Sequence, residues 1–258
     1  MIGKITVSAA ALCMVSAAGI TAAEQKSSDP VFTSSQYQCK IFSRYLKDSG
    51  LINLTRNGKI LISRNRFAAT VEGSDGKGCG LSEKADTQYE WKDNVLTSRK
   101  TIVARDAKAG PYAELTRKIQ FSDNKVTCEI TVKNLKDIVF AKTWTRYREE
   151  LYIPTDSVMG MRADGILLND TTLSTLIPRK FDRKKWHFKE DMKKITLTDS
   201  ENRTVVFTAG PSCRLECHHY GGKAIEINAS NIYKQINHRQ KAGQETKIGY
   251  TIEFGKAE

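Results

Sequence analysis

The stretch that decides the fold is residues 126–133, which read VTCEITVK. Every second side chain in this run is apolar, beginning at Val126 and ending at Val132. A period of two places these side chains on one face of a β-strand and the polar ones on the other. Residues 112–121 repeat the alternation more loosely, and the turn formers Ser-Asp-Asn-Lys at 122–125 separate the two runs. We therefore predict an antiparallel hairpin with one buried face, in a mostly antiparallel β protein.

The chain on both sides of this hairpin has the same character. A third run, residues 138–153, ends at Pro154 and is predicted to complete a three-stranded meander. Residues 50–62 hold two short apolar runs around Asn57-Gly58, a strong hairpin signal. Further strands are predicted at residues 36–46, 67–71, 89–96, 99–105, 195–198, 204–207, 213–219, 224–228 and 246–254.

The first 23 residues have the features of a signal peptide. Lys4 precedes the apolar run 5–18, and the small residues 21–23 stand before Glu24. The run is too short and too rich in Ala and Ser for a lasting membrane anchor. We expect a signal peptide at 1–23, a single domain at 24–258, no transmembrane anchor after cleavage, and a periplasmic or secreted location.

The charge balance limits the partners. The formal net charge is +12, and such an excess describes partners and solubility rather than the fold. It favours acidic polysaccharides or other cell-surface anions, and no specific nucleic-acid partner is expected. A basic surface that serves only solubility is the alternative.

Five cysteines follow the predicted signal peptide: Cys39, Cys79, Cys128, Cys213 and Cys217. An odd number leaves at least one thiol free in an exported protein. Cys128 is the predicted buried free thiol, because it lies on the apolar face of its strand. The pairing of the others stays open.

Two motifs resemble a known family. The pattern at 50–62, a glycine, an apolar pair, Leu, Asn-Gly-Lys and an apolar run, resembles the opening of the galactose-mutarotase-like β-supersandwich. Residues 242–254, AGQETKIGYTIEF, resemble the closing strand of carbohydrate-associated β-sandwiches. The resemblance implies an all-β, two-sheet antiparallel β-sandwich, with a jelly roll as the alternative. This fold occurs in aldose epimerases and as a domain of glycoside hydrolases and polysaccharide lyases.

Candidate substrate-binding residues come from two segments. In the third run the even-numbered side chains share one face. Residues 178–194 form a lysine- and arginine-rich segment with aromatic side chains among its charges. The candidates are Trp144, Arg146, Arg148, Tyr152, Trp186 and His187. Aromatic rings stack on sugar rings, and arginine forks bind carboxylate or sulfate. The alternative is a solvated outer face with cross-strand ion pairs.

The resemblance also implies catalytic candidates, because mutarotases pair a histidine acid with a carboxylate base. His219, His218 and Glu226 supply these types. The family's Asn-His motif, followed by an aromatic residue and Asn, is absent: Asn237-His238 continues as Arg239-Gln240. For a lyase, Tyr147, Tyr152 and Arg146 would supply the base and the carboxylate neutraliser.

The sequence predicts no metal site and no cofactor. Cys213, Cys217, His218 and His219 are ligand types, but their spacing is not a standard zinc spacing. A strand at 213–219 would turn His218 away from the other three.

These features predict an exported carbohydrate-associated protein that binds or processes an extracellular glycan, with an anionic glycan as one option. The alternative is a non-catalytic envelope or periplasmic structural or interaction protein with a basic surface. Catalysis, the glycan and the oligomeric state stay open.

Overall fold

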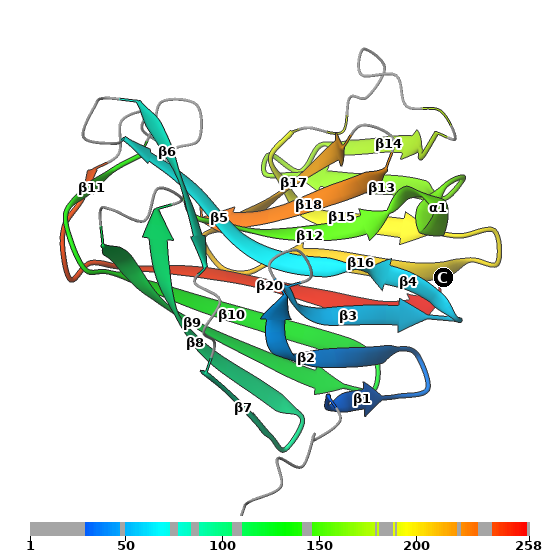
Figure 1. The fold of residues 1–258 in the computed structure, drawn as a ribbon. Helices are drawn as coiled ribbons and strands as arrows, with labels where there is room; N and C mark the ends of the chain where they lie inside the picture. The colour runs from blue at the N-terminus through cyan, green and yellow to red at the C-terminus, as the bar shows by residue number, and fades with distance from the viewer. Residues whose placement is uncertain are drawn as a thin grey trace, which may run out of the picture.

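The computed structural model describes residues 29–46, 50–72, 77–83, 88–104, 110–140, 146–178, 180, 188, 190–220, 223–231 and 239–256. Within these ranges the chain is almost entirely β-strand (Figure 1). The strands are β1 (Val31–Thr33), β2 (Gln38–Leu46), β3 (Gly50–Arg56), β4 (Lys59–Ile62), β5 (Arg64–Glu72), β6 (Gly78–Glu83), β7 (Gln88–Lys92), β8 (Val95–Ala104), β9 (Pro111–Ser122), β10 (Lys125–Asn134), β11 (Ile138–Val139), β12 (Arg148–Pro154), β13 (Arg162–Leu167), β14 (Thr172–Leu176), β15 (Met192–Thr198), β16 (Arg203–Ala209), β17 (Cys213–Tyr220), β18 (Ala224–Asn231), β19 (Arg239–Gln240) and β20 (Glu245–Lys256). The short helix α1 (Thr155–Val158) follows β12.

One large sheet dominates the molecule. Its strands run in the order β14-β13-β15-β16-β20-β10-β9-β8-β6-β5-β12-β18-β17, and β7 adds to β8. A further pairing, between Met192 and Leu215, joins β17 at one end of this path to β15, the third strand from the other end. A second sheet holds β1-β2-β3-β4, and β11 pairs with β19. The all-β prediction is confirmed. The predicted sandwich of two separate sheets is not seen in this simple form, because the larger sheet is continuous and curls back on itself.

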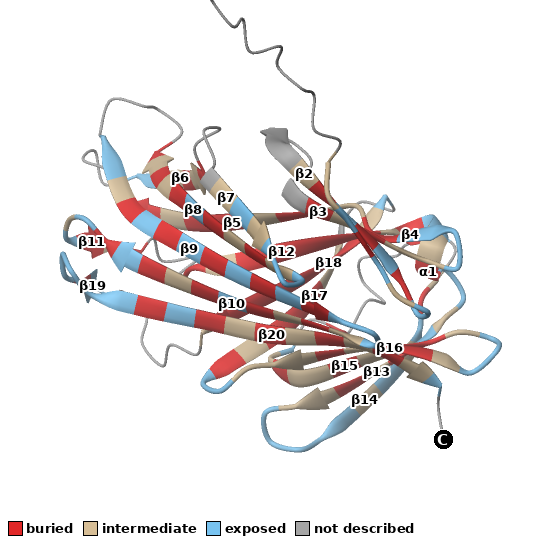
Figure 2. Cartoon of the chain, turned by 90° about the horizontal axis from the view of Figure 1, so that it is seen from below, coloured by how far each residue is buried: buried red, intermediate tan, exposed pale blue. Residues whose placement is uncertain are grey.

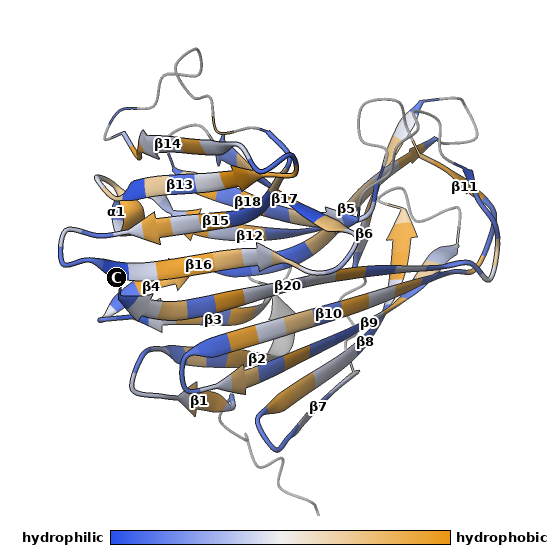
Figure 3. Cartoon of the chain, turned by 180° about the vertical axis from the view of Figure 1, so that it is seen from behind, coloured by the Kyte–Doolittle hydropathy of each residue, from blue (hydrophilic) through white to orange (hydrophobic). Residues whose placement is uncertain are grey.

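The hairpin that the sequence predicted is β9 and β10. Val126 lies opposite Phe121, and every second side chain of both strands is buried (Figure 2). The same bands appear as alternating hydropathy along β10 and β20 (Figure 3). Burying these alternating apolar side chains is the main stabilising term for such a sheet.

The predicted third strand of the meander is wrong. The other neighbour of β10 is the last strand, β20, with Cys128 opposite Tyr250. The third run instead contains β11 and β12, and β12 lies between β5 and β18. Residues Glu149–Ile153 of β12 are all buried, so both faces of this strand are covered. A strand at a sheet edge beside the hairpin would leave one of its faces in contact with solvent.

The local turn predictions are confirmed. β3 and β4 form a hairpin around Asn57 and Gly58, whose φ angles are 50° and 72°. Both angles lie in the left-handed region that a type I′ turn requires. β15 and β16 form the predicted hairpin around residues 199–202.

The five described cysteines are free thiols. Cys128 is fully buried, as predicted, and burial raises the pKa of its thiol to about 12. Cys213 and Cys217 lie four positions apart on β17, which separates their Cα atoms by roughly 13 Å. That separation excludes a disulfide between them.

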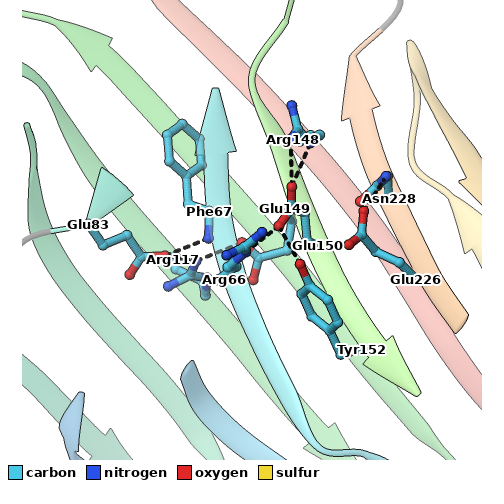
Figure 4. Close-up of polar contacts among 10 residues, drawn as sticks. All are labelled: Arg66, Phe67, Glu83, Arg117, Arg148, Glu149, Glu150, Tyr152, Glu226 and Asn228. Carbon is cyan, nitrogen blue, oxygen red and sulfur yellow. Dashed lines mark hydrogen bonds and ion pairs between the residues drawn. The ribbon is translucent and has the colours of Figure 1, made fainter. Parts of the chain in front are cut away.

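A charged network is buried in the core. The Arg117 guanidinium contacts two carboxylates, Glu83 Oε1 at 2.8 Å and Glu149 Oε2 at 2.7 Å. Lys100 contacts the other oxygen of Glu83, and Asn65 donates to Glu149 Oε1 at 2.7 Å. The network thereby ties β5, β6, β8, β9 and β12 together and fixes Glu149 on the inner face of β12 (Figure 4).

The network predicts an acid-sensitive term in stability. Burial alone would raise the pKa of Glu83, but Arg117 and Lys100 outweigh it and lower that pKa to about 2. In the unfolded chain Glu83 takes up a proton near pH 4.5, whereas the native state stays ionised down to about pH 2. Stability from this group is therefore present above pH 4.5 and is lost as the pH falls toward 2, by up to about 3 kcal/mol. We expect the difference in unfolding free energy between wild type and Glu83→Gln, measured by urea titration, to shrink over this interval. A difference that is constant or grows on acidification would contradict the assignment.

Candidate functional site

Four neighbouring strands carry a dense set of polar side chains on their outer face. The strands are β5, β12, β18 and β17, and their registers align the side chains in three rows. We call this surface the polar face. The first row is Arg64, Tyr152, Glu226 and His218; the second is Arg66, Glu150, Asn228 and Glu216; the third is Ala68, Arg148, Ser230 and Arg214.

The rows follow from strict alternation in each strand. On β12 the side chains of Leu151 and Ile153 enter the core, so Glu150 and Tyr152 point outward. On β18 Ile225 enters the core in the same way. Since the strands pair in register, outward residues from distant parts of the chain become direct neighbours.

Glu150 lies between two arginines. Arg148 Nε and Nη2 both lie 2.7 Å from Glu150 Oε1, and Arg66 contacts Oε2 from the other side (Figure 4). The Tyr152 hydroxyl also donates to Oε2 at 3.0 Å. Burial would raise the pKa of Glu150, but Arg148 and Arg66 outweigh it and lower the pKa. Glu150 therefore stays ionised and holds both guanidiniums in place.

Glu216 repeats this arrangement two strands away. Arg146 contacts its Oε1, Arg214 Nη2 lies 3.5 Å from the same atom, and His218 Nε2 lies 3.4 Å from Oε2. Burial alone would raise the pKa of Glu216, but His218 and Arg146 outweigh this effect and lower the pKa. Nearby Asp191 contacts Arg214, and burial together with Glu216 raises the pKa of Asp191 to about 6.

Glu226 differs from both. Asn228 donates to its Oε1 at 2.9 Å, whereas the nearby Tyr152 hydroxyl donates its proton to Glu150. No lysine, arginine or histidine forms an ion pair with Glu226 among the described residues. Its carboxylate is thus held by one neutral donor, directly opposite His218 across the β17–β18 pair.

The two predicted histidines lie on opposite faces of β17. His218 belongs to the polar face and its side chain is 29% exposed. His219 lies opposite Ile225, on the side of the core, and burial lowers its pKa. Only His218 is placed to meet a ligand on the polar face together with Glu226.

The polar face has two layers of charge. Its carboxylates lie deep: Glu150 is 1% exposed and Glu226 is 7% exposed. Among the guanidiniums Arg66 lies nearest the solvent, with 32% of its side chain exposed, whereas the side chains of Arg148 and Arg214 are 12% and 11% exposed. A ligand approaching this face therefore meets the Arg66 side chain before it meets the carboxylates.

The structure brings together five of the predicted site residues: Arg146, Arg148, Tyr152, His218 and Glu226. The Tyr152 ring is not an open stacking platform, because the Arg64 guanidinium lies 3.8 Å from its centroid and the residue is 3% exposed. Trp144, Trp186 and His187 lie outside the described residues.

Another predicted candidate, Tyr147, is fully buried in the core. Its hydroxyl donates to Asn134 Oδ1 at 2.6 Å, so it is not placed as a base for a bound substrate.

Sequence reasoning missed Arg64, Arg66, Glu216 and Asn228 as site residues. A signal was present, because polar residues occupy every second position in otherwise apolar strands, as at 226, 228 and 230. Their convergence depends on strand order, which the signal does not contain.

Neither a metal site nor a membrane-spanning helix is found in the described part of the chain. No group of three or more His, Cys, Asp or Glu side chains there is arranged to hold a metal ion. None of the helical structure in those ranges has the length and apolar character to cross a membrane.

Comparison with known proteins relates the chain to others by structure alone. No protein-family profile and no curated protein sequence matches it. A galactose mutarotase-like protein from Lactobacillus casei ATCC 334 superimposes with a TM-score of 0.56 at 12% identity, over 88% of this chain and 100% of the other. A putative aldose 1-epimerase from Escherichia coli K12 gives a TM-score of 0.54 at 10% identity, over 88% and 98%.

The same fold is found within a larger enzyme. The galactosidase domain of an α-galactosidase–sucrose kinase gives a TM-score of 0.56 at 8% identity, over 88% of this chain and 40% of the other. The chain therefore has the galactose-mutarotase-like fold, as its opening and closing motifs predicted.

Proposed function

We propose that this protein is exported to the periplasm or the cell exterior as a single domain, and there binds or processes an anionic glycan on the polar face. The observation that carries the proposal is the pairing of His218 with Glu226 across adjacent strands, on a face that also carries several arginines. Support for a carbohydrate comes from the fold, whose relatives include a putative aldose epimerase and a galactosidase domain. Support for export comes from the signal-peptide features of residues 1–23.

The charge layering favours an anionic ligand. Arg64, Arg66 and Arg148 lie side by side on β5 and β12, and Glu150 fixes two of them in position. A fixed guanidinium fork matches the geometry of a carboxylate or sulfate group and loses little entropy on binding it. Uronic or sulfated sugars carry such groups, whereas a neutral sugar offers only hydroxyls.

The His218–Glu226 pair supplies the groups for proton transfer. A carboxylate held by a neutral donor and no ion pair is available to accept a proton, and an imidazole opposite it is suited to donate one. This division of roles matches the histidine acid and carboxylate base that the resemblance implies. Asn228 positions the Glu226 carboxylate through its hydrogen bond.

The first experiment incubates the protein with neutral, uronic and sulfated polysaccharides at two salt concentrations, with binding and product formation followed together. Saturable binding of uronic or sulfated polymers that survives the higher salt supports the proposal, because screening removes diffuse attraction first. New reducing or unsaturated ends identify processing, and binding without product identifies recognition alone. Silence across the panel contradicts the glycan proposal and favours the structural or interaction role.

Adjacent histidines provide a matched pair of variants. We expect His218→Asn to lower product formation by about 100-fold or more, because it removes the proposed proton donor. His219→Asn, on the opposite face of the same strand, is expected to change the rate by less than about threefold. Initial rates on the best substrate, with thermal unfolding as a check on folding, compare the two. Equal losses in both variants would contradict the role of His218.

A further inference from the structure

A cavity lies away from the polar face. Its volume is about 470 Å³, and its walls come from the β3–β4 hairpin, the segment from α1 to Met161, and the β15–β16 hairpin. Figure 1 shows β4, α1 and the neighbouring ends of β15 and β16 together at one side of the molecule. The polar face is built from β5, β12, β17 and β18, so the two sites share no strand.

One wall of this cavity carries two neighbouring cations, and the carboxylates of Asp156, Asp199 and Glu201 also line the cavity. Arg56 and Lys59 flank the Asn57-Gly58 turn and are direct cross-strand partners. Like charges in this position repel each other. Within the described ranges no carboxylate forms an ion pair with either of them, whereas Arg203 on the facing wall is paired with Asp199 at 2.7 Å and Glu201 at 3.0 Å.

Arg56 is held in place without being neutralised. Its Nη1 donates to the Thr204 carbonyl at 2.6 Å and its Nη2 to the Gly255 carbonyl at 3.0 Å. Both acceptors are neutral, so the guanidinium is oriented while its charge is left unpaired. Burial lowers the pKa of Arg56, Asp199 acts in the opposite direction, and Arg203 adds to the lowering.

The rest of the lining mixes apolar side chains with polar ones such as Ser157 and Ser200. Leu61, Leu197 and Val205 are buried and contribute to its lining. Ile60 and Met159 also contribute and are among the exposed large apolar residues, at 42% and 38%. Its volume is in the range of roughly 300–1,000 Å³ that is usual for small-molecule sites.

We propose that this cavity binds a small organic anion. Its carboxylate or phosphate group lies between Arg56 and Lys59 and relieves their repulsion. Its apolar part packs against Ile60 and Met159, which removes their surface from water. This site is independent of the glycan proposed for the polar face.

Calorimetric titration tests the proposal with phenyl phosphate and benzoate as probes, and with benzyl alcohol as a neutral analogue. Both anions are expected to bind saturably in the wild-type protein, and benzyl alcohol at least about tenfold more weakly. Lys59→Glu is expected to weaken phenyl phosphate binding by at least about tenfold. Because Lys59 is exposed and forms no ion pair with another described residue, this change should not disturb folding.

A charge-matched control separates the site from the general basicity of the chain. Lys118→Glu changes the net charge equally at an exposed position on β9 and is expected to alter affinity less than about twofold. Equal weakening in both variants, equal binding of benzyl alcohol, or no saturable binding of either anion below about 10 mM would each overturn the proposal. Unchanged binding in His218→Asn would show that the polar face is not the site observed.

Discussion

Replacement of Arg117 by methionine is expected to lower the free energy of unfolding by about 3–5 kcal/mol. Arg117 is 1% exposed and contacts the carboxylates of Glu83 and Glu149, which are themselves buried. Methionine approximates the length of the side chain but leaves Glu149 with Asn65 as its remaining polar contact among the described residues. The loss is therefore mainly the cost of a buried carboxylate without a cation, measured by urea or thermal unfolding.

Two further variants define the origin of this loss. Adding Glu149→Leu to Arg117→Met removes the stranded carboxylate, so the double variant is expected to be more stable than Arg117→Met alone by about 1 kcal/mol or more. Lys125→Met breaks the exposed pair with Glu253, whose atoms lie 2.7 Å apart, and is expected to cost less than about 1 kcal/mol. A cost for Arg117→Met as small as that of Lys125→Met would show that the buried network contributes little.

Replacement of Glu226 by glutamine is expected to reduce product formation on the glycan substrate by about 100-fold or more. Glutamine keeps the size of the side chain and an oxygen that accepts the hydrogen bond from Asn228. It removes the basic carboxylate opposite His218. Binding should therefore persist while the chemical step is lost, which kcat measured apart from KM detects.

Glu129 offers a matched control. It is an exposed residue of β10, and Glu129→Gln makes the same chemical change outside the polar face. We expect its kcat to stay within about twofold of wild type. If Glu226→Gln retained wild-type kcat, the proton-transfer role of Glu226 would be wrong, and the polar face would be a recognition surface alone.

Most of the strands could be predicted because their signal is local. The alternation at Val126 to Val132 and the Asn57-Gly58 turn each specify a face or a reversal within a few residues, whatever the rest of the chain does. One predicted strand was wrong, because its residues also contain a local turn. Residues 89–96 were predicted as one strand, but Asp93 and Asn94 adopt positive φ angles and turn the chain between β7 and β8.

The candidate site could be predicted only in part. Arg148 and Tyr152 were placed on one face correctly, since two residues along one strand determine that relation. Arg66 and Glu216 were not connected with them, because they come from strands far away in the sequence. The register of β5 against β12, and of β17 against β18, joins them.

Local patterns in the chain were enough to predict the all-β class, the hairpins, the faces of the strands and the resemblance to the galactose-mutarotase-like fold. The pairing of β10 with β20, the buried network of Glu83, Arg117 and Glu149, and the position of His218 opposite Glu226 emerged only in the folded molecule. This difference follows from the range of the forces involved. Side-chain alternation acts between neighbours along the chain, whereas strand order is set by the joint burial of apolar faces and buried charges over the whole molecule.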